Sequence, residues 1–252
     1  MPDNQNRALA GKVAVVTGGS RNIGRAIALS LAGEGAAVVV GAGSDAEAAR
    51  SVADEIAAAG GRGIAHLADV TEEAAVNGLA DAAVEAFGRI DILVNNAALR
   101  RQQPFVEMTL AQWREITAVV LDGAFLCARA CVPHIIAAGG GAIVNIGGIS
   151  AHVGARNRAH VMAAKAGLIG LTKALALELA EHGITANCVV PGTIDTVRGA
   201  SAGKRPAFVS TSLIDRLGRP QEIAAMVRHL CLPEARYITG QTIHVSGGRY
   251  LP

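Results

Sequence analysis

Residues 12–32 read KVAVVTGGSRNIGRAIALSLA, and this stretch decides the fold. Its first five residues form an apolar run, which predicts a strand buried on both faces of a parallel sheet. The glycine-rich segment Thr17–Gly24 follows, and residues 25–32 then show a helical pattern. A strand, a glycine-rich turn and a helix in this order point backbone N–H groups and the positive helix end at a pyrophosphate site.

The length of 252 residues predicts one α/β domain over residues 1–252, because a single domain of this size buries most of the surface that the chain exposes when unfolded. The net charge of +2 gives no reason to expect nucleic acid or an acidic membrane surface as a partner. No uninterrupted apolar run reaches the ~20 residues that span a bilayer, and residues 1–11 lack the apolar core of a secretory signal. We therefore expect a soluble, cytoplasmic protein.

The cysteines do not have the paired spacing of a zinc site. No metal is expected, and the thiols are interpreted as buried and free. The residues concerned are Cys127, Cys131, Cys188 and Cys231.

Strand and helix patterns alternate along the rest of the chain. Further strands are predicted at 36–40, 63–67, 90–95, 142–146, 185–190 and 242–245, and helices at 45–59, 72–87, 110–137 and 161–182. This alternation predicts a Rossmann-like, doubly wound parallel sheet of about seven strands flanked by helices. Ligands of such sheets bind outside the carboxyl ends of the strands.

Several motifs occur in a characteristic order: the Thr17–Gly24 turn, Asp69-Val70, Asn95-Asn96-Ala97-Ala98, Lys165-Ala166-Gly167, the segment 191–196 and the segment 240–248. Together they resemble the short-chain dehydrogenase/reductase family over nearly the whole chain. The resemblance implies an NAD(P)-binding domain.

The resemblance also implies the cofactor contacts, segment by segment. Near the pyrophosphate and the adenosine ribose it places Gly18, Ser20, Arg21, Ile23 and Gly24, together with Asn22, which replaces the usual middle glycine of the turn. It places Asp69 and Val70 at the adenine, Asn95 behind the ribose, Lys165 at the nicotinamide ribose, and Ile194 and Thr196 at the carboxamide. Ala97, Pro191 and Gly192 complete the implied set.

The end of the second strand bears on cofactor choice. An NAD enzyme is expected to offer a carboxylate there to the ribose 2′-hydroxyl, but Ala42 occupies that position. The guanidinium of Arg21, with help from Ser44, could meet a 2′-phosphate instead. NADP(H) is therefore favoured over NAD(H), although Gly43 stands where the family often has a second arginine.

The active site departs from the family pattern. The family tyrosine, four residues before the lysine, falls on Val161; the family serine falls on Gly148 and the family asparagine on Val120. Of the four usual catalytic residues only Lys165 remains. A general acid contributes ~10²–10⁴-fold to a rate, so reduction of simple ketones should be severely impaired. A substrate such as an iminium, whose carbon is already electrophilic, escapes that penalty.

Two histidines, His160 and His152, are the main candidate replacements for the missing acid, and Ser150 is a weaker one. A histidine titrates close to neutral pH. His160 cannot simply take the direction of residue 161, because adjacent helical residues point about 100° apart. Tyr237 and Tyr250 are weaker candidates, and each of these side chains also fits an ordinary surface, cap or packing role.

Basic residues in three segments are expected to converge at the carboxyl edge of the sheet. They are Arg100, Arg101, Arg156, Arg158, Arg198, Lys204 and Arg205. Single loop arginines often serve only solubility, but their convergence predicts a small anionic substrate, such as a carboxylate or a phosphate.

Three functions remain open from the sequence. The leading hypothesis is an NADP(H)-dependent oxidoreductase of atypical mechanism that reduces an imine, an iminium or an activated C=O or C=C bond. The alternatives are a lyase, isomerase or cyclase without net redox change, and a catalytically silent cofactor-binding subunit. The resemblance further implies a homotetramer built on the long helices 110–137 and 161–182.

Overall fold

The computed structural model describes residues 7–197 and 212–252. Seven parallel strands form one sheet in the order β3-β2-β1-β4-β5-β6-β7, which confirms the predicted fold class. The order changes direction between β1 and β4, so the topological switch point lies between these two strands. The strands are β1 Val13–Val16, β2 Ala37–Ala42, β3 Arg62–Leu67, β4 Ile92–Asn95, β5 Gly141–Ile146, β6 Ile184–Pro191 and β7 Thr242–Val245.

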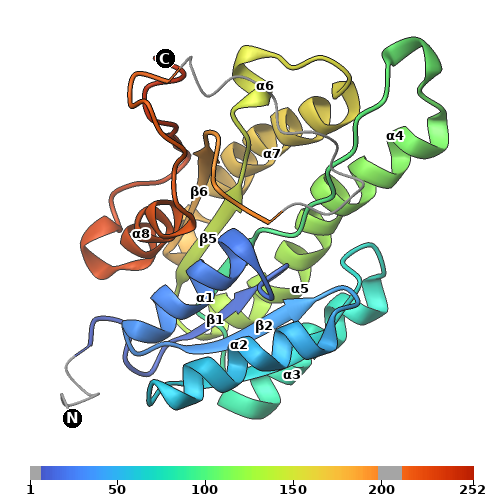
Figure 1. The fold of residues 1–252 in the computed structure, drawn as a ribbon. Coiled ribbons are helices and arrows are strands. Elements are labelled where there is room, and N and C mark those ends of the chain that lie inside the picture. The colour runs from blue at the N-terminus through green and yellow to red at the C-terminus, as the bar shows by residue number, and fades with distance from the viewer. Residues whose placement is uncertain (1–6, 198–211) are drawn as a thin grey trace.

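Helices cover both faces of the sheet (Figure 1). One face packs against α1 Asn22–Gly33, α2 Ala46–Ala58 and α8 Pro220–Cys231. The other packs against α3 Glu73–Phe87, α5 Gly123–Ala137 and α7 Ala159–Glu178. The strand period of two divides the apolar residues between the layers: Ala14 and Val16 face the first layer, and Val13 and Val15 face the second.

The predicted helix 110–137 is not one regular helix. It consists of α4 Leu110–Thr117, a π-helical turn over Ala118–Asp122, and α5. A helical pattern continues from α4 through this turn into α5, so the sequence pattern gave no sign that the helical period widens there. The predicted helix 161–182 begins earlier, at Ala159, and ends at Glu178, followed by the 3₁₀ turn Ala180–His182.

Helix α8 lies outside the predicted elements, although its start carries two recognisable signals. Pro220 occupies the first turn, and the Glu222 carboxylate accepts a hydrogen bond of 2.7 Å from the Arg219 N–H. Proline at the first helical position and glutamate at the third both favour helix initiation. The short α6 Ser150–Val153 and the 3₁₀ turns Phe105–Glu107 and Pro233–Ala235 complete the helical elements of the described residues.

Two helical stretches, Leu110–Ala137 and Ala159–Glu178, are long and apolar enough to cross a bilayer by length and composition. Polar residues interrupt both stretches, so the sequence criterion of an uninterrupted apolar run did not identify them. Core helices of soluble proteins meet the same criterion, and α7 packs directly against β6 in the sheet.

Candidate active site

The glycine-rich turn is fastened to the start of the loop after β4. Asn96 donates side-chain hydrogen bonds to the carbonyls of Thr17 and Gly18, at 3.0 and 2.9 Å. The Thr17 hydroxyl in return accepts from the backbone N–H groups of Asn96 and Ala97. A Cβ at Gly24 would lie 2.0 Å from the Gly18 oxygen, so only glycine allows this close packing. Thr17 and Asn96, which lie in two of the sequence motifs but were assigned no role there, therefore hold the turn in place.

The first turn of α1 has no side-chain cap. Arg21 occupies the N-cap position in an extended conformation without a capping hydrogen bond, and no acidic residue lies in the first turn. The unpaired N–H groups and the positive end of the helix macrodipole therefore suit an anion. Ser20 and the exposed Arg21 lie at the rim, while Ile23 and Gly24 are buried.

The end of β2 lies beside this turn, because the Gly19 N–H donates to the Gly41 carbonyl. Ala42 is buried as the last residue of β2, and Ser44 is exposed beyond it. After β3, one oxygen of the Asp69 carboxylate accepts from the N–H and the hydroxyl of Thr71.

Asn95 points into the protein rather than along the surface. Its amide donates to the Asn145 side chain at 2.9 Å and to the Ala124 carbonyl at 3.3 Å. Asn145 in turn donates to the Thr172 hydroxyl on α7. This buried network joins β4, β5 and α7 beneath the carboxyl edge of the sheet. Its sequence signals were Asn95, in its motif, and the single polar residue within the apolar strand β5.

Lys165 is buried at that edge. Its Nζ donates to the Ile146 carbonyl at the end of β5, at 2.5 Å. The pKa of Lys165 is lowered to about 8, mainly because the ammonium is buried; Cys188 opposes this shift, and the Arg100 guanidinium contributes to it. Arg100 also donates to the Thr196 hydroxyl at 3.4 Å. The structure thus brings Lys165, Arg100 and Thr196 together.

Val120 and Val161 belong to one apolar cluster between α4, the π turn and α7. The cluster consists of Ile116, Val120, Ala124, Val161, Ala164 and Leu168. Gly148 has open space instead: the nearest atom to an added Cβ would be the Cγ of Lys165, at 3.7 Å. The three positions to which the resemblance assigns the asparagine, the tyrosine and the serine therefore carry no polar side chain.

Comparison with known proteins agrees with this architecture. A family model described as enoyl-(acyl carrier protein) reductase matches residues 18–249. The 3-oxoacyl-[acyl-carrier-protein] reductase of Synechocystis is 41% identical over 242 residues, 96% of this chain and 98% of the relative. The FabG reductase of Escherichia coli, with the same named activity, is 40% identical over 96% of this chain and 98% of its own length. The chain belongs to the short-chain dehydrogenase/reductase family.

Solved structures of this family superpose on nearly the whole chain. A dehydrogenase/reductase from Sinorhizobium meliloti gives a TM-score of 0.91 at 40% identity, covering 97% of both chains. A doubly substituted mutant of a Serratia marcescens short-chain dehydrogenase/reductase gives 0.89 at 37% identity, covering 96% of this chain and 99% of its own.

His160 of this short-chain dehydrogenase/reductase is buried at 1% exposure. Neither ring nitrogen makes a hydrogen bond of good geometry to a residue in 7–197 or 212–252. Burial lowers the pKa of His160, while the Arg158 backbone and the Glu115 carboxylate on α4 oppose that shift. The ring therefore lies within electrostatic reach of α4.

His152 forms a ring cluster with His244 on β7 and Tyr250 near the C-terminus. The ring centroids of the two histidines are 4.4 Å apart, and Tyr250 lies 5.1 Å from His152 and 4.8 Å from His244. Burial lowers the pKa of both histidines. Ser150 begins α6 close by in the sequence, whereas Tyr237 is fully exposed to solvent after the last 3₁₀ turn.

The predicted cationic residues are not equivalent. Arg101 forms a bidentate ion pair with Glu115, at 2.5 and 2.9 Å, so its charge is already matched. Arg156 is exposed on the loop before α7. Arg198, Lys204 and Arg205 lie outside the described residues. Within the described residues, no group of three or more His, Cys, Asp or Glu side chains is arranged to hold a metal.

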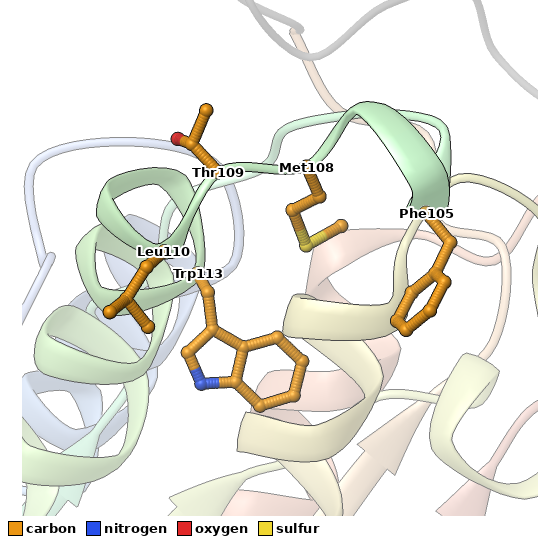
Figure 2. Close-up of a pocket in the computed structure, with 5 residues that line it drawn as sticks. All are labelled: Phe105, Met108, Thr109, Leu110 and Trp113. Atoms are coloured by element: carbon orange, nitrogen blue, oxygen red, sulfur yellow. The ribbon is translucent and has the colours of Figure 1, made fainter.

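A shallow hollow of about 270 Å³ opens between the 3₁₀ turn at Phe105 and the start of α4. Figure 2 shows the Met108 side chain directed into it from the loop above, with the Trp113 indole below. Phe105, Thr109 and Leu110 complete its lining. None of the predicted site residues lines this hollow.

Proposed function

We propose that this protein is an NADP(H)-dependent reductase that acts on an activated double bond in a small anionic substrate. The observation that supports this proposal most directly is the packing of Val120, in the π turn, and Val161, on the helix that carries Lys165, in one apolar cluster. Valines at both positions indicate an active site adapted to work without the family's tyrosine and asparagine. The surrounding chain, residues 1–252, is taken as one dinucleotide-binding domain.

The residues at the carboxyl edge fit a dinucleotide. The uncapped first turn of α1 suits its diphosphate. Lys165 retains two ammonium protons beyond its bond to Ile146, and these can bind the nicotinamide ribose hydroxyls. Bound there, a nicotinamide cofactor supplies or accepts a hydride. The relatives' names, all reductases, support the same reaction class.

The absent tyrosine restricts the substrate. Without a general acid, a ketone loses ~10²–10⁴-fold in rate. A protonated imine carries its own positive charge, and an activated C=O or C=C bond also depends less on an acid. Arg100, next to Thr196 and Lys165, can hold a substrate carboxylate or phosphate. Where a proton is required, His160, His152 and Ser150 are the candidate donors.

A matched substrate panel tests this function. Cyclic imines, activated enones and simple ketones, each with and without a carboxylate, are incubated with protein and NADPH, and absorbance at the nicotinamide band is followed. We expect turnover of an acidic imine or activated substrate and little with simple ketones. NADPH binding without turnover of any substrate would favour a silent subunit or a non-redox enzyme.

We expect NADPH to bind at least about tenfold more tightly than NADH, because a charge-assisted hydrogen bond contributes about 1.5–3 kcal/mol. Arg21→Ala should reduce this preference by most of that factor. Arg25→Ala removes a charge on the same helix, where the side chain pairs with Glu55, and serves as the matched control. Isothermal titration of all three proteins with both cofactors measures the effect, and equal affinities in the native protein would contradict it.

We also expect a cytoplasmic homotetramer, with a mass near four times the 25.6 kDa chain. Supporting this, α7 exposes Leu177 at 82% and α5 exposes Phe125, an apolar surface that a second copy would cover. Light scattering measures the mass. Leu177→Glu should lower it, whereas Leu251→Glu, at the exposed C-terminus, should not; a monomeric native protein would rule out this assembly.

A further inference from the structure

The side chain of Asn22 bridges two parts of the chain that are 175 residues apart. Its Nδ2 donates to the Val197 carbonyl at 3.0 Å, and its Oδ1 accepts from the Val197 N–H at 2.9 Å. Both polar backbone groups of one residue are thus held by one amide side chain. We name this pair of hydrogen bonds the Asn22–Val197 clasp.

The backbone at residue 22 explains why asparagine can form the clasp. Asn22 has φ of 51°, in the left-handed region. Glycine, asparagine and aspartate adopt this region with the least strain. Of these three, only asparagine carries both a donor and an acceptor on its side chain. Asn22 therefore preserves the turn that a glycine would make and adds two bonds that a glycine cannot form.

The clasp joins two walls of the proposed cofactor site. Asn22 is the first residue of α1, where the diphosphate is expected. Val197 directly follows the buried Thr196, on the segment that leaves β6. Val197 is 85% exposed, so the two bonds lie at the protein surface beside the proposed cofactor site.

We propose that Asn22 is a positioning residue that fastens the segment after β6 to the glycine-rich turn and thereby slows release of the dinucleotide. The inference rests on the proposed cofactor. Release requires the segment to separate from the turn, and each separation breaks both bonds of the clasp. Removing the clasp should therefore raise the rate of release more than it changes the rate of association.

Asn22→Gly is the informative variant, because glycine keeps the positive φ and loses only the side chain. Asn157→Gly is its matched control: Asn157 is the other left-handed asparagine among the described residues, with φ of 60°, and its carbonyl accepts from the Gln103 N–H. This control makes the same chemical change without touching the clasp.

The first measurement uses the cofactor-free protein. Hydrogen exchange at the Val197 amide should become about tenfold faster in Asn22→Gly and stay at the native rate in Asn157→Gly. Unchanged exchange in Asn22→Gly would show that the clasp does not hold the segment, and would overturn the inference without reference to any cofactor.

The second measurement is stopped-flow displacement of NADPH, followed by its fluorescence. We expect release about tenfold faster from Asn22→Gly, association changed less than threefold, and native kinetics in Asn157→Gly. If hydrogen exchange at the Val197 amide of Asn22→Gly is faster but release of NADPH is unchanged, the inference is overturned and the proposed function is not. Failure of the native protein to bind either NADPH or NADH would overturn the proposed function and the inference with it.

Discussion

Replacing Val161 by tyrosine together with Gly148 by serine should create measurable reduction of simple ketones, at least about 10²-fold above the native rate. Residue 161 lies four positions before Lys165 on α7, so the new phenol would share a helix face with the ammonium group. The serine fits because an added Cβ at Gly148 contacts only the Lys165 Cγ, at 3.7 Å. The ammonium would lower the phenol's pKa and ready it as an acid.

The matched control is Val161→Phe with Gly148→Ser, which adds nearly the same bulk to the apolar cluster without the hydroxyl. NADPH oxidation rates of the native protein and both double variants are compared across one ketone panel. Equal rates for the tyrosine and phenylalanine variants would show that the hydroxyl donates no proton. Ordinary ketone turnover by the native protein would mean that another residue already supplies the acid.

Lys165→Met should stabilise the cofactor-free protein near neutral pH, and the advantage should disappear at high pH. The pKa of Lys165 falls from 10.5 to about 8 on folding because the ammonium is buried. Below pH 8 both states carry the proton, and the folded state bears the full cost of the buried charge. Between about pH 8 and 10.5 the unfolded state binds more protons, so the native protein gains stability as the pH rises. The shift corresponds to about 3 kcal/mol.

The measurement is the free energy of unfolding in denaturant at several pH values from 7 to 10.5, for native protein and variant. The difference between the two should shrink toward high pH, because other titrating groups cancel in the comparison. Lys173→Met, an exposed position on the same helix, controls for the loss of one surface charge. A difference that stays constant with pH would show that Lys165 is not desolvated as the structure indicates.

The sheet was predictable because its strands are locally apolar and its turns carry glycine. Ala14 and Val16 alternate with Val13 and Val15 between two helical layers, and each strand end agreed within two residues. The π turn at Ala118–Asp122 was not predictable, since the residues of this short wider turn continue the helical pattern on either side of it.

The candidate site likewise contains features that the sequence predicts and features that it does not. Lys165 was identified from its motif, but its desolvation depends on how α7 packs against β5 and β6. The burial of His160 beside Glu115 depends on the docking of α4, and the Asn22–Val197 clasp depends on residues far apart in the chain. Contacts of this kind are set by tertiary packing, which one sequence does not display.

The position of β1 in the sheet has a consequence for synthesis of the chain. Val15 pairs with Val39 on one side and with Leu93 on the other. Strand β2 leaves the ribosome soon after β1, but β4 follows only after a further ~50 residues. Their synthesis takes several seconds at ~5–20 residues per second. Throughout that interval the nascent chain exposes the unpaired edge of an apolar strand. The N-terminal half is therefore open to incorrect strand pairing until β4 has been synthesised.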